Sequence, residues 1–251
     1  MLETRGLVKR YSGRTVVDRV SYTVNPAEIV GLLGRNGAGK TTSFRMTIGM
    51  IDPNEGQVFF RGEEITGLPM YKRAQRGMGY LSQEPSVFQR LTVEQNLVAI
   101  LETIKTYSRR ERKQRAAALM DQFGLTTQRN QHARTLSGGE RRKLEIARAM
   151  VTNPTLVLLD EPFSGVDPIA VEELQREIRR LREEHGVAIL LTDHNVRETL
   201  SVTDRSYIIF EGRVLKQGNP RDLINDPQVR RTYLGSTFRG DEFDEVDKTE
   251  S

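Results

Sequence analysis

The chain has 251 residues and a formal net charge of +4, with 37% hydrophobic and 29% charged residues. A chain of this size can bury a sizeable core in one domain or in two closely joined lobes. No segment approaches the roughly 20 apolar residues of a membrane span, and the absence of cysteine excludes a disulfide framework and a thiolate metal site.

The charges are distributed unevenly along the chain. Residues 241–251 contain six acidic side chains and one lysine, so the preceding body is more basic than the net charge indicates. Its arginines are scattered and aromatic residues make up only 6% of the chain, which argues against nucleic-acid binding and favours solvated helix faces. We predict that the acidic residues 239–251 form a disordered tail. The N-terminus lacks the apolar run of a signal peptide, so we expect a cytoplasmic protein.

The first 80 residues are predicted to form antiparallel strands around one buried strand and one helix. Apolar and polar side chains alternate toward the end of residues 2–24, as on a half-buried strand. Residues 29–33 are a short apolar run typical of a buried strand, and residues 41–50 can form a helix. Residues 58–60 are a further strand that ends at a turn.

Residues 34–42, here called the phosphate loop, lie between that buried strand and that helix and match G-x-x-x-x-G-K-[ST]. Glycines let backbone N–H groups surround phosphate oxygens, and the helix N-terminus adds free donors. Lys40 can reach the β- and γ-phosphates of ATP, and the Thr41 hydroxyl can hold Mg²⁺. The preceding strand disfavours a glycine-rich turn that carries a lysine by chance. The predicted nucleotide-binding residues of the loop are Gly34, Asn36, Gly37, Ala38, Gly39, Lys40, Thr41 and Thr42.

Helical periodicity dominates the middle of the chain. Apolar residues recur at intervals of three and four in residues 93–104. A second helix is predicted over residues 109–123, with Gly124 as its C-cap, and a third begins at Ser137. We predict that about residues 88–150 form an α-helical subdomain inserted into an α/β body.

Strands and helices alternate again after this block. Residues 155–159 and 187–191 have the pattern of buried strands, and residues 169–184 have that of a helix. Residues 207–216 can form a hairpin around Glu211 and Gly212. The alternation predicts a parallel sheet flanked by helices.

Asp160 and Glu161 directly follow one of these apolar strands. Ligands bind at the carboxyl ends of strands in open α/β sheets, so Asp160 can hold the Mg²⁺ of a nucleotide, directly or through water. Consecutive side chains project to opposite sides of a strand. Glu161 can therefore stay off the metal and polarise an attacking water. A solvated acidic pair is the alternative, and the preceding phosphate loop disfavours it.

Ser137, Gly138, Gly139 and Glu140 open the third predicted helix. Ser137 and Glu140 have the spacing of a capping box, which would serve the helix alone. The two glycines expose backbone donors that can bind an anion, and they favour nucleotide contact by these four residues.

The Leu-Ser-Gly-Gly-Glu sequence between the phosphate loop and the acid-terminated strand resembles the signature of the ATP-binding cassette (ABC) ATPases of ABC transporters. The resemblance covers about residues 1–235, and we place the cassette domain at residues 1–238. It implies an α/β fold with a phosphate-loop core, an antiparallel β subdomain and the inserted helical subdomain. It also implies ATP hydrolysis with Mg²⁺.

The resemblance assigns further residues one by one. Tyr11 would stack on adenine near Val16, Gln83 would sense Mg²⁺ and the attacking water, and His194 would contact the γ-phosphate. The expected catalytic residues are then Glu161, His194 and Gln83, and the expected metal residues are Thr41, Gln83 and Asp160.

The resemblance also implies a head-to-tail homodimer, in which each ATP lies between the phosphate loop of one chain and residues 137–140 of the other. Four segments are similar to the ATPase subunits of lipopolysaccharide transporters, namely residues 79–91, 161–168, 192–200 and 233–239. That likeness implies extraction of lipopolysaccharide at the cytoplasmic face of the inner membrane, with membrane partners resembling LptF and LptG, and with LptC.

The same likeness places the docking site of a membrane partner at Phe88 and Arg90, so that the chain meets the membrane only through its partners. A core position in the helical lobe is the alternative for Phe88. Arg35 stands where these subunits usually have proline, and Ser82 stands where they often have proline. Neither difference removes a group that donates to phosphate.

Three alternatives for the whole chain remain. The first is a cassette for another substrate, such as branched-chain amino acids. The second is a soluble cassette protein of DNA repair or translation, although the chain has neither a long coiled-coil insertion nor tandem cassettes. The third, a protein that only binds ATP, is disfavoured by Glu161.

Overall fold

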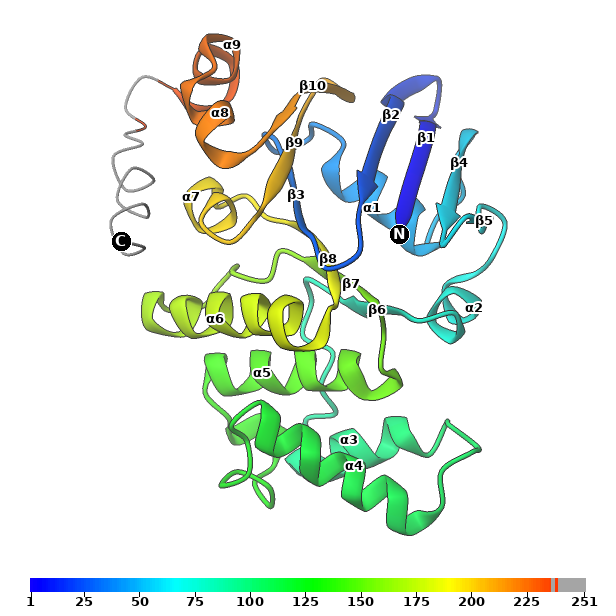
Figure 1. Cartoon of the computed structure of the whole chain (residues 1–251), viewed down its shortest axis with the longest axis vertical. Coiled ribbons are helices and arrows are strands. Elements are labelled where there is room, and N and C mark those ends of the chain that lie inside the picture. Colours follow the sequence, from blue (N-terminus) through cyan, green and yellow to red (C-terminus); the bar gives the residue numbers. More distant parts are fainter. Residues whose placement is uncertain (236–237, 239–251) are drawn as a thin grey trace.

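Two β-sheets and a helical lobe make up the structure, a computed structural model that describes residues 1–235 and Phe238 (Figure 1). The acidic tail predicted for residues 239–251 lies outside the described residues. Among the described residues, no helix combines the length and apolarity that crossing a membrane requires.

The first sheet is antiparallel and has the strand order β2-β1-β4-β5. Its strands are β1 (Leu2–Tyr11), β2 (Arg14–Val24), β4 (Glu55–Phe60) and β5 (Glu63–Glu64). Val20, Tyr22 and Val24 are buried and alternate with more exposed neighbours, as the sequence predicts for one strand face.

The second sheet has six strands in the order β10-β9-β3-β8-β7-β6, and only β10 runs antiparallel to its neighbour. Its strands are β3 (Ile29–Leu33), β6 (Met78–Leu81), β7 (Leu156–Asp160), β8 (Ala188–Thr192), β9 (Arg205–Phe210) and β10 (Arg213–Gly218). Every residue of β3, β7 and β8 is buried, because elements cover both faces of this sheet. The parallel strands bring their carboxyl ends to one edge, where the phosphate loop follows β3 and Asp160 is the last residue of β7.

Helix α1 (Lys40–Ile48) lies between the two sheets (Figure 1). Its Phe44 and Met46 are fully buried in a core that also contains residues of β1, β3 and β4. The other helices of this body are α2 (Met70–Gln75), α6 (Pro168–His185), α7 (Val196–Leu200), α8 (Pro220–Asn225) and α9 (Pro227–Val229), with a π-helical turn at Arg230–Leu234. The phosphate loop therefore leads directly into a helix that is packed in this core.

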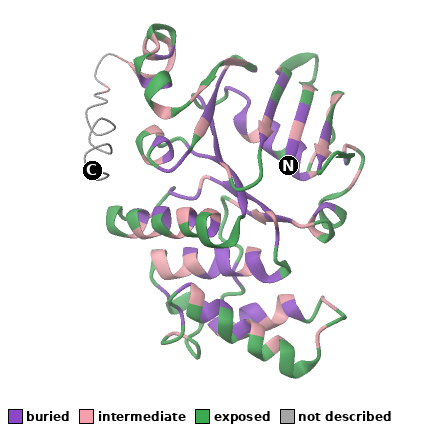
Figure 2. Ribbon diagram, in the orientation of Figure 1, coloured by how far each residue is buried: buried purple, intermediate pink, exposed green. Residues whose placement is uncertain are grey.

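A second core joins the helical lobe to the opposite side of the body. The lobe consists of α3 (Val93–Leu101), α4 (Arg109–Gln122) and α5 (Gly138–Ala149), with 3₁₀ turns at Ala133–Thr135 and Met150–Thr152. Helix α5 packs on α6, and the outer surfaces of α4 and α6 are largely exposed (Figures 1 and 2). The C-cap of α4 is Phe123, so the predicted cap residue Gly124 lies one position later, where its φ of +63° is left-handed.

The first helix of the lobe ends earlier than the periodicity predicts. Helix α3 stops at Leu101, and Ile104 lies in a turn in which its N–H donates to the Leu101 carbonyl over 3.1 Å. Ile104 still packs against the same core as α3. Ile104 is therefore apolar because it packs into the core from the loop after α3, and the helix does not continue to this residue.

Candidate nucleotide-binding site

The phosphate loop is shaped by two close backbone approaches. Gly39 has φ of +102°, and a Cβ there would lie 2.8 Å from the Val16 carbonyl oxygen. A Cβ on Gly34 would lie 2.2 Å from the Ile209 carbonyl oxygen. Gly39 is the N-cap of α1 and supplies no capping side chain, so the first N–H groups of α1 have no side-chain cap. These donors and the positive end of the helix dipole suit a phosphate group.

Lys40 is folded across the phosphate loop. Its Nζ donates to the carbonyl oxygens of Gly34 over 2.6 Å and Arg35 over 3.1 Å. Burial lowers the pKa of Lys40, and the nearby carboxylates of Glu161, Asp193 and Asp160 act in the opposite direction. The loop therefore holds a lysine ammonium on its own carbonyl oxygens, with three carboxylates nearby.

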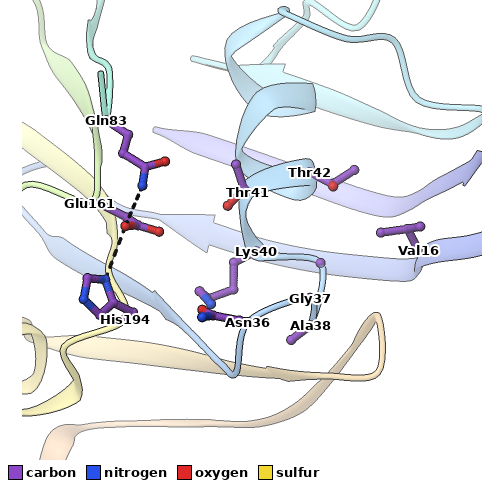
Figure 3. A pocket seen from close by; sticks show the side chains of 11 residues that line it. Val16, Asn36, Gly37, Ala38, Lys40, Thr41, Thr42, Gln83, Glu161 and His194 are labelled. Carbon is purple, nitrogen blue, oxygen red and sulfur yellow. Dashed lines mark hydrogen bonds and ion pairs between the residues drawn. The ribbon is translucent and has the colours of Figure 1, made fainter. Parts of the chain in front are cut away.

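An open cavity of about 530 Å³ lies in front of the loop (Figure 3). The residues that line it are Val16, Asn36, Gly37, Ala38, Gly39, Lys40, Thr41, Thr42, Gln83, Glu161 and His194. All eleven are among the residues that the sequence predicts for nucleotide binding or catalysis. The structure thus brings together side chains from segments as far apart as Val16 and His194.

The polar side chains of Gln83, Glu161 and His194 lie together, with Glu161 between the other two (Figure 3). Glu161 Oε2 accepts a hydrogen bond from Gln83 Nε2 over 2.9 Å and lies 3.3 Å from His194 Nδ1. Gln83, Glu161 and His194 follow the carboxyl ends of β6, β7 and β8, which are adjacent in the sheet. The parallel topology therefore explains why residues distant in sequence meet at one carboxylate.

Asp160 can bind a cation directly or through a water molecule that the cation coordinates. It is 1% exposed, and its Oδ1 has no hydrogen-bond partner among the described residues. Burial, with a further contribution from Glu161, raises the pKa of Asp160 to about 6. A buried carboxylate oxygen without a donor is costly unless a cation or proton satisfies it. The Thr41 hydroxyl and Gln83 supply neutral oxygens in the cavity, so this donor set fits Mg²⁺.

Several predicted site residues lie away from this cavity. Tyr11 is 47% exposed at the end of β1 and is not part of the lining. Residues 137–140 open α5, where Ser137 Oγ accepts from the Glu140 N–H over 3.2 Å and Glu140 Oε2 accepts from the Ser137 N–H over 2.8 Å. The predicted capping box is therefore present. These residues do not line the cavity of their own chain.

Asp193 belongs to the site and is absent from the sequence prediction. It is fully buried, and its carboxylate accepts the N–H groups of Phe163 over 3.0 Å and Asn195 over 2.9 Å. The side chain thereby ties the turn after β7 to the turn that carries His194. An acid at a strand end is the signal that could have identified it, as it identified Asp160.

Comparison with known proteins defines the class. The family model described as ABC transporter matches residues 17–164, and the chain belongs to this family. Over 239 residues it is 50% identical to the lipopolysaccharide export system ATP-binding protein LptB of Haemophilus influenzae, covering 95% of this chain and 99% of that protein. It is 49% identical over 238 residues to LptB of Escherichia coli K12, with coverages of 95% and 98%.

Solved structures agree with the fold. The ADP conformation of MJ1267, an ATP-binding cassette of an ABC transporter, superposes with a TM-score of 0.85 at 26% identity. The superposition covers 94% of this chain and 98% of that one. The α/β fold predicted for a cassette ATPase is therefore confirmed, and the chain is an ATP-hydrolysing enzyme.

Proposed function

We propose that the chain is the ATP-hydrolysing subunit of a lipopolysaccharide export transporter. The observation that carries this proposal is the identity of about 50%, over nearly the whole length, to proteins named for that system. The site supports the enzymatic part, because the cavity combines a phosphate loop with Glu161, Gln83 and His194. A cassette for another substrate, such as branched-chain amino acids, is the alternative.

The cavity suggests how ATP is held. The N–H groups of the phosphate loop surround the β- and γ-phosphates, and Lys40 adds a positive charge beside them. Thr41, Gln83 and Asp160 would hold Mg²⁺, which neutralises negative charge on the phosphates when bound. Val16 lines the same cavity, and Tyr11 would complete the adenine contact from the end of β1.

The cluster around Glu161 suggests how ATP is cleaved. Glu161 Oε2 accepts a proton from a water whose oxygen attacks the γ-phosphorus, and the bond to the β-phosphate oxygen breaks to release ADP. Gln83 and His194 orient the carboxylate through the contacts of 2.9 and 3.3 Å. His194 and the phosphate loop line one cavity, which supports a contact between His194 and the γ-phosphate.

His194→Ala should retain ATP binding and slow hydrolysis by about one order of magnitude, because Glu161 loses one of two orienting partners and Gln83 remains. Fluorescent-nucleotide titration and steady-state turnover on one preparation measure the two effects. A loss of ATP affinity as large as the loss of turnover would contradict this role for His194.

We further propose a head-to-tail homodimer. Residues 137–140 of one chain would then complete the cavity of the other, which accounts for their absence from the cavity of their own chain. The membrane partners would resemble LptF and LptG, with LptC, and they would hold the chain at the cytoplasmic face of the inner membrane.

Phe88 and Arg90 are our proposed docking residues for a membrane partner. Phe88 is 47% exposed, which excludes the alternative of a core position. The Arg148 guanidinium lies 4.6 Å from the centroid of the Phe88 ring, and Asn96 Oδ1 accepts the Phe88 N–H over 2.8 Å. A ring fixed in this way offers apolar area to a partner at little further loss of conformational entropy.

Phe88→Ala should leave the melting temperature and the basal ATPase activity of the isolated chain unchanged, while co-purification with the membrane partners falls. Phe123 is the matched control, because it lies in the same lobe and is 1% exposed. Phe123→Ala should lose ~3–5 kcal/mol of unfolding free energy. A destabilised Phe88→Ala protein, or one with an unchanged pull-down, would remove Phe88 from the docking site.

A further inference from the structure

Arg142 is a buried cation that the chemistry described above does not use. It lies in α5, is 7% exposed, and reaches the turn after β7. Its Nη2 donates to the carbonyl oxygens of Asp160 over 3.3 Å and Glu161 over 3.2 Å, and its Nε donates to that of Pro162 over 3.2 Å. Three successive carbonyls of the catalytic turn therefore converge on one guanidinium.

The same guanidinium also holds the segment that carries Gln83. Arg142 Nη1 donates to the Ser82 carbonyl over 3.1 Å and to Glu145 Oε2 over 2.8 Å. The other oxygen of Glu145 accepts the Ser86 N–H over 2.9 Å. Arg142 and Glu145 together thus hold residues 82 and 86, on either side of Gln83.

These contacts account for an unusual backbone conformation at Glu161. Glu161 has φ of +47°, in the left-handed region that residues other than glycine rarely adopt. Such a conformation persists only where the surroundings impose it. All five N–H donors of the Arg142 guanidinium have an acceptor, three of them carbonyls of this turn. The planar fork of an arginine can satisfy both segments at once, whereas an ammonium cannot.

We infer that Arg142, with Glu145, is a positioning residue that sets the geometry between Glu161 and Gln83. It acts through the backbone of residues 160–162 and through residues 82–86, and it does not touch ATP. Both segments are held from α5, the helix that begins at residues 137–140. The inference rests on the proposed role of Glu161 in hydrolysis.

The test must separate positioning from simple stabilisation. Removing Arg142 alone leaves Glu145 as a buried unpaired charge, which destabilises the fold. The double variant Arg142→Met with Glu145→Gln removes both charges and keeps an acceptor for the Ser86 N–H. We expect its melting temperature to lie near that of the wild-type chain, with kcat lowered about 10- to 100-fold. ADP affinity should stay within about twofold, because the phosphate loop is not altered.

Lys143→Met is the matched control. Lys143 is the next residue of α5 and pairs with Glu173 of α6 over 2.7 Å, away from the catalytic turn, so kcat and ADP affinity should not change. A double variant with normal stability and wild-type kcat would overturn the inference. If the double variant does not fold, Arg142→Lys replaces it, with lowered kcat expected and wild-type kcat contradicting the inference. Absence of turnover in the wild-type chain would instead reject the proposed function.

Discussion

Glu161→Gln should bind ATP as the wild-type chain does and hydrolyse it about 10²- to 10⁴-fold more slowly. The substitution preserves the size of the side chain and the oxygen that accepts from Gln83 over 2.9 Å, but an amide cannot take a proton from water at neutral pH. Cavity shape and Lys40 are unaltered, so affinity should persist. With hydrolysis blocked, ATP should also hold the proposed dimer together.

Steady-state turnover, nucleotide titration and size-exclusion chromatography with ATP measure these three properties. Glu183→Gln is a suitable control, because Glu183 is an exposed residue of α6 that pairs only with Arg182 among the contacts described. The control should behave as the wild-type chain. Wild-type turnover in Glu161→Gln would show that Glu161 is not the base.

Lys40→Ala should weaken ATP binding itself, by about 10- to 100-fold, because a charge-assisted contact to phosphate is worth about 1.5–3 kcal/mol. Among the residues that the structure describes, Lys40 is the only lysine that lines the cavity, and its ammonium lies over the loop carbonyls. The exposed Lys113 of α4 provides the control Lys113→Ala, for which affinity should not change. Titration with ATP under conditions that prevent hydrolysis gives the dissociation constants directly. Wild-type ATP affinity in Lys40→Ala would show that Lys40 does not contribute to phosphate binding.

The cavity could be predicted from sequence because its chemistry lies in short motifs. The phosphate loop needs glycines that approach Val16 and Ile209, and such contacts restrict the residue types within nine consecutive positions. Glu161 and Asp160 follow an apolar run, so the strand end was visible without the structure. Once both motifs were placed on parallel strands, their meeting at one sheet edge followed.

Arg142 could not be predicted in the same way. Its acceptors lie 18 to 20 residues away at the catalytic turn and 60 residues away at Ser82, and no local pattern records these pairings. The end of α3 was missed for a related reason, since burial of Ile104 in a turn mimics helical periodicity. For Ser137 and Glu140 the local pattern is clear but its role is not. A capping box and a nucleotide contact require the same local geometry, so the sequence could not distinguish between them.

The most direct test of the account is to purify the tagged chain from detergent-solubilised native membranes and to identify its partners by mass spectrometry. We expect subunits resembling LptF and LptG, together with LptC, and a lower yield of these subunits with Phe88→Ala. Recovery of amino-acid permease subunits in their place would contradict the lipopolysaccharide assignment. Recovery of the chain without any membrane subunit would contradict its role in a transporter.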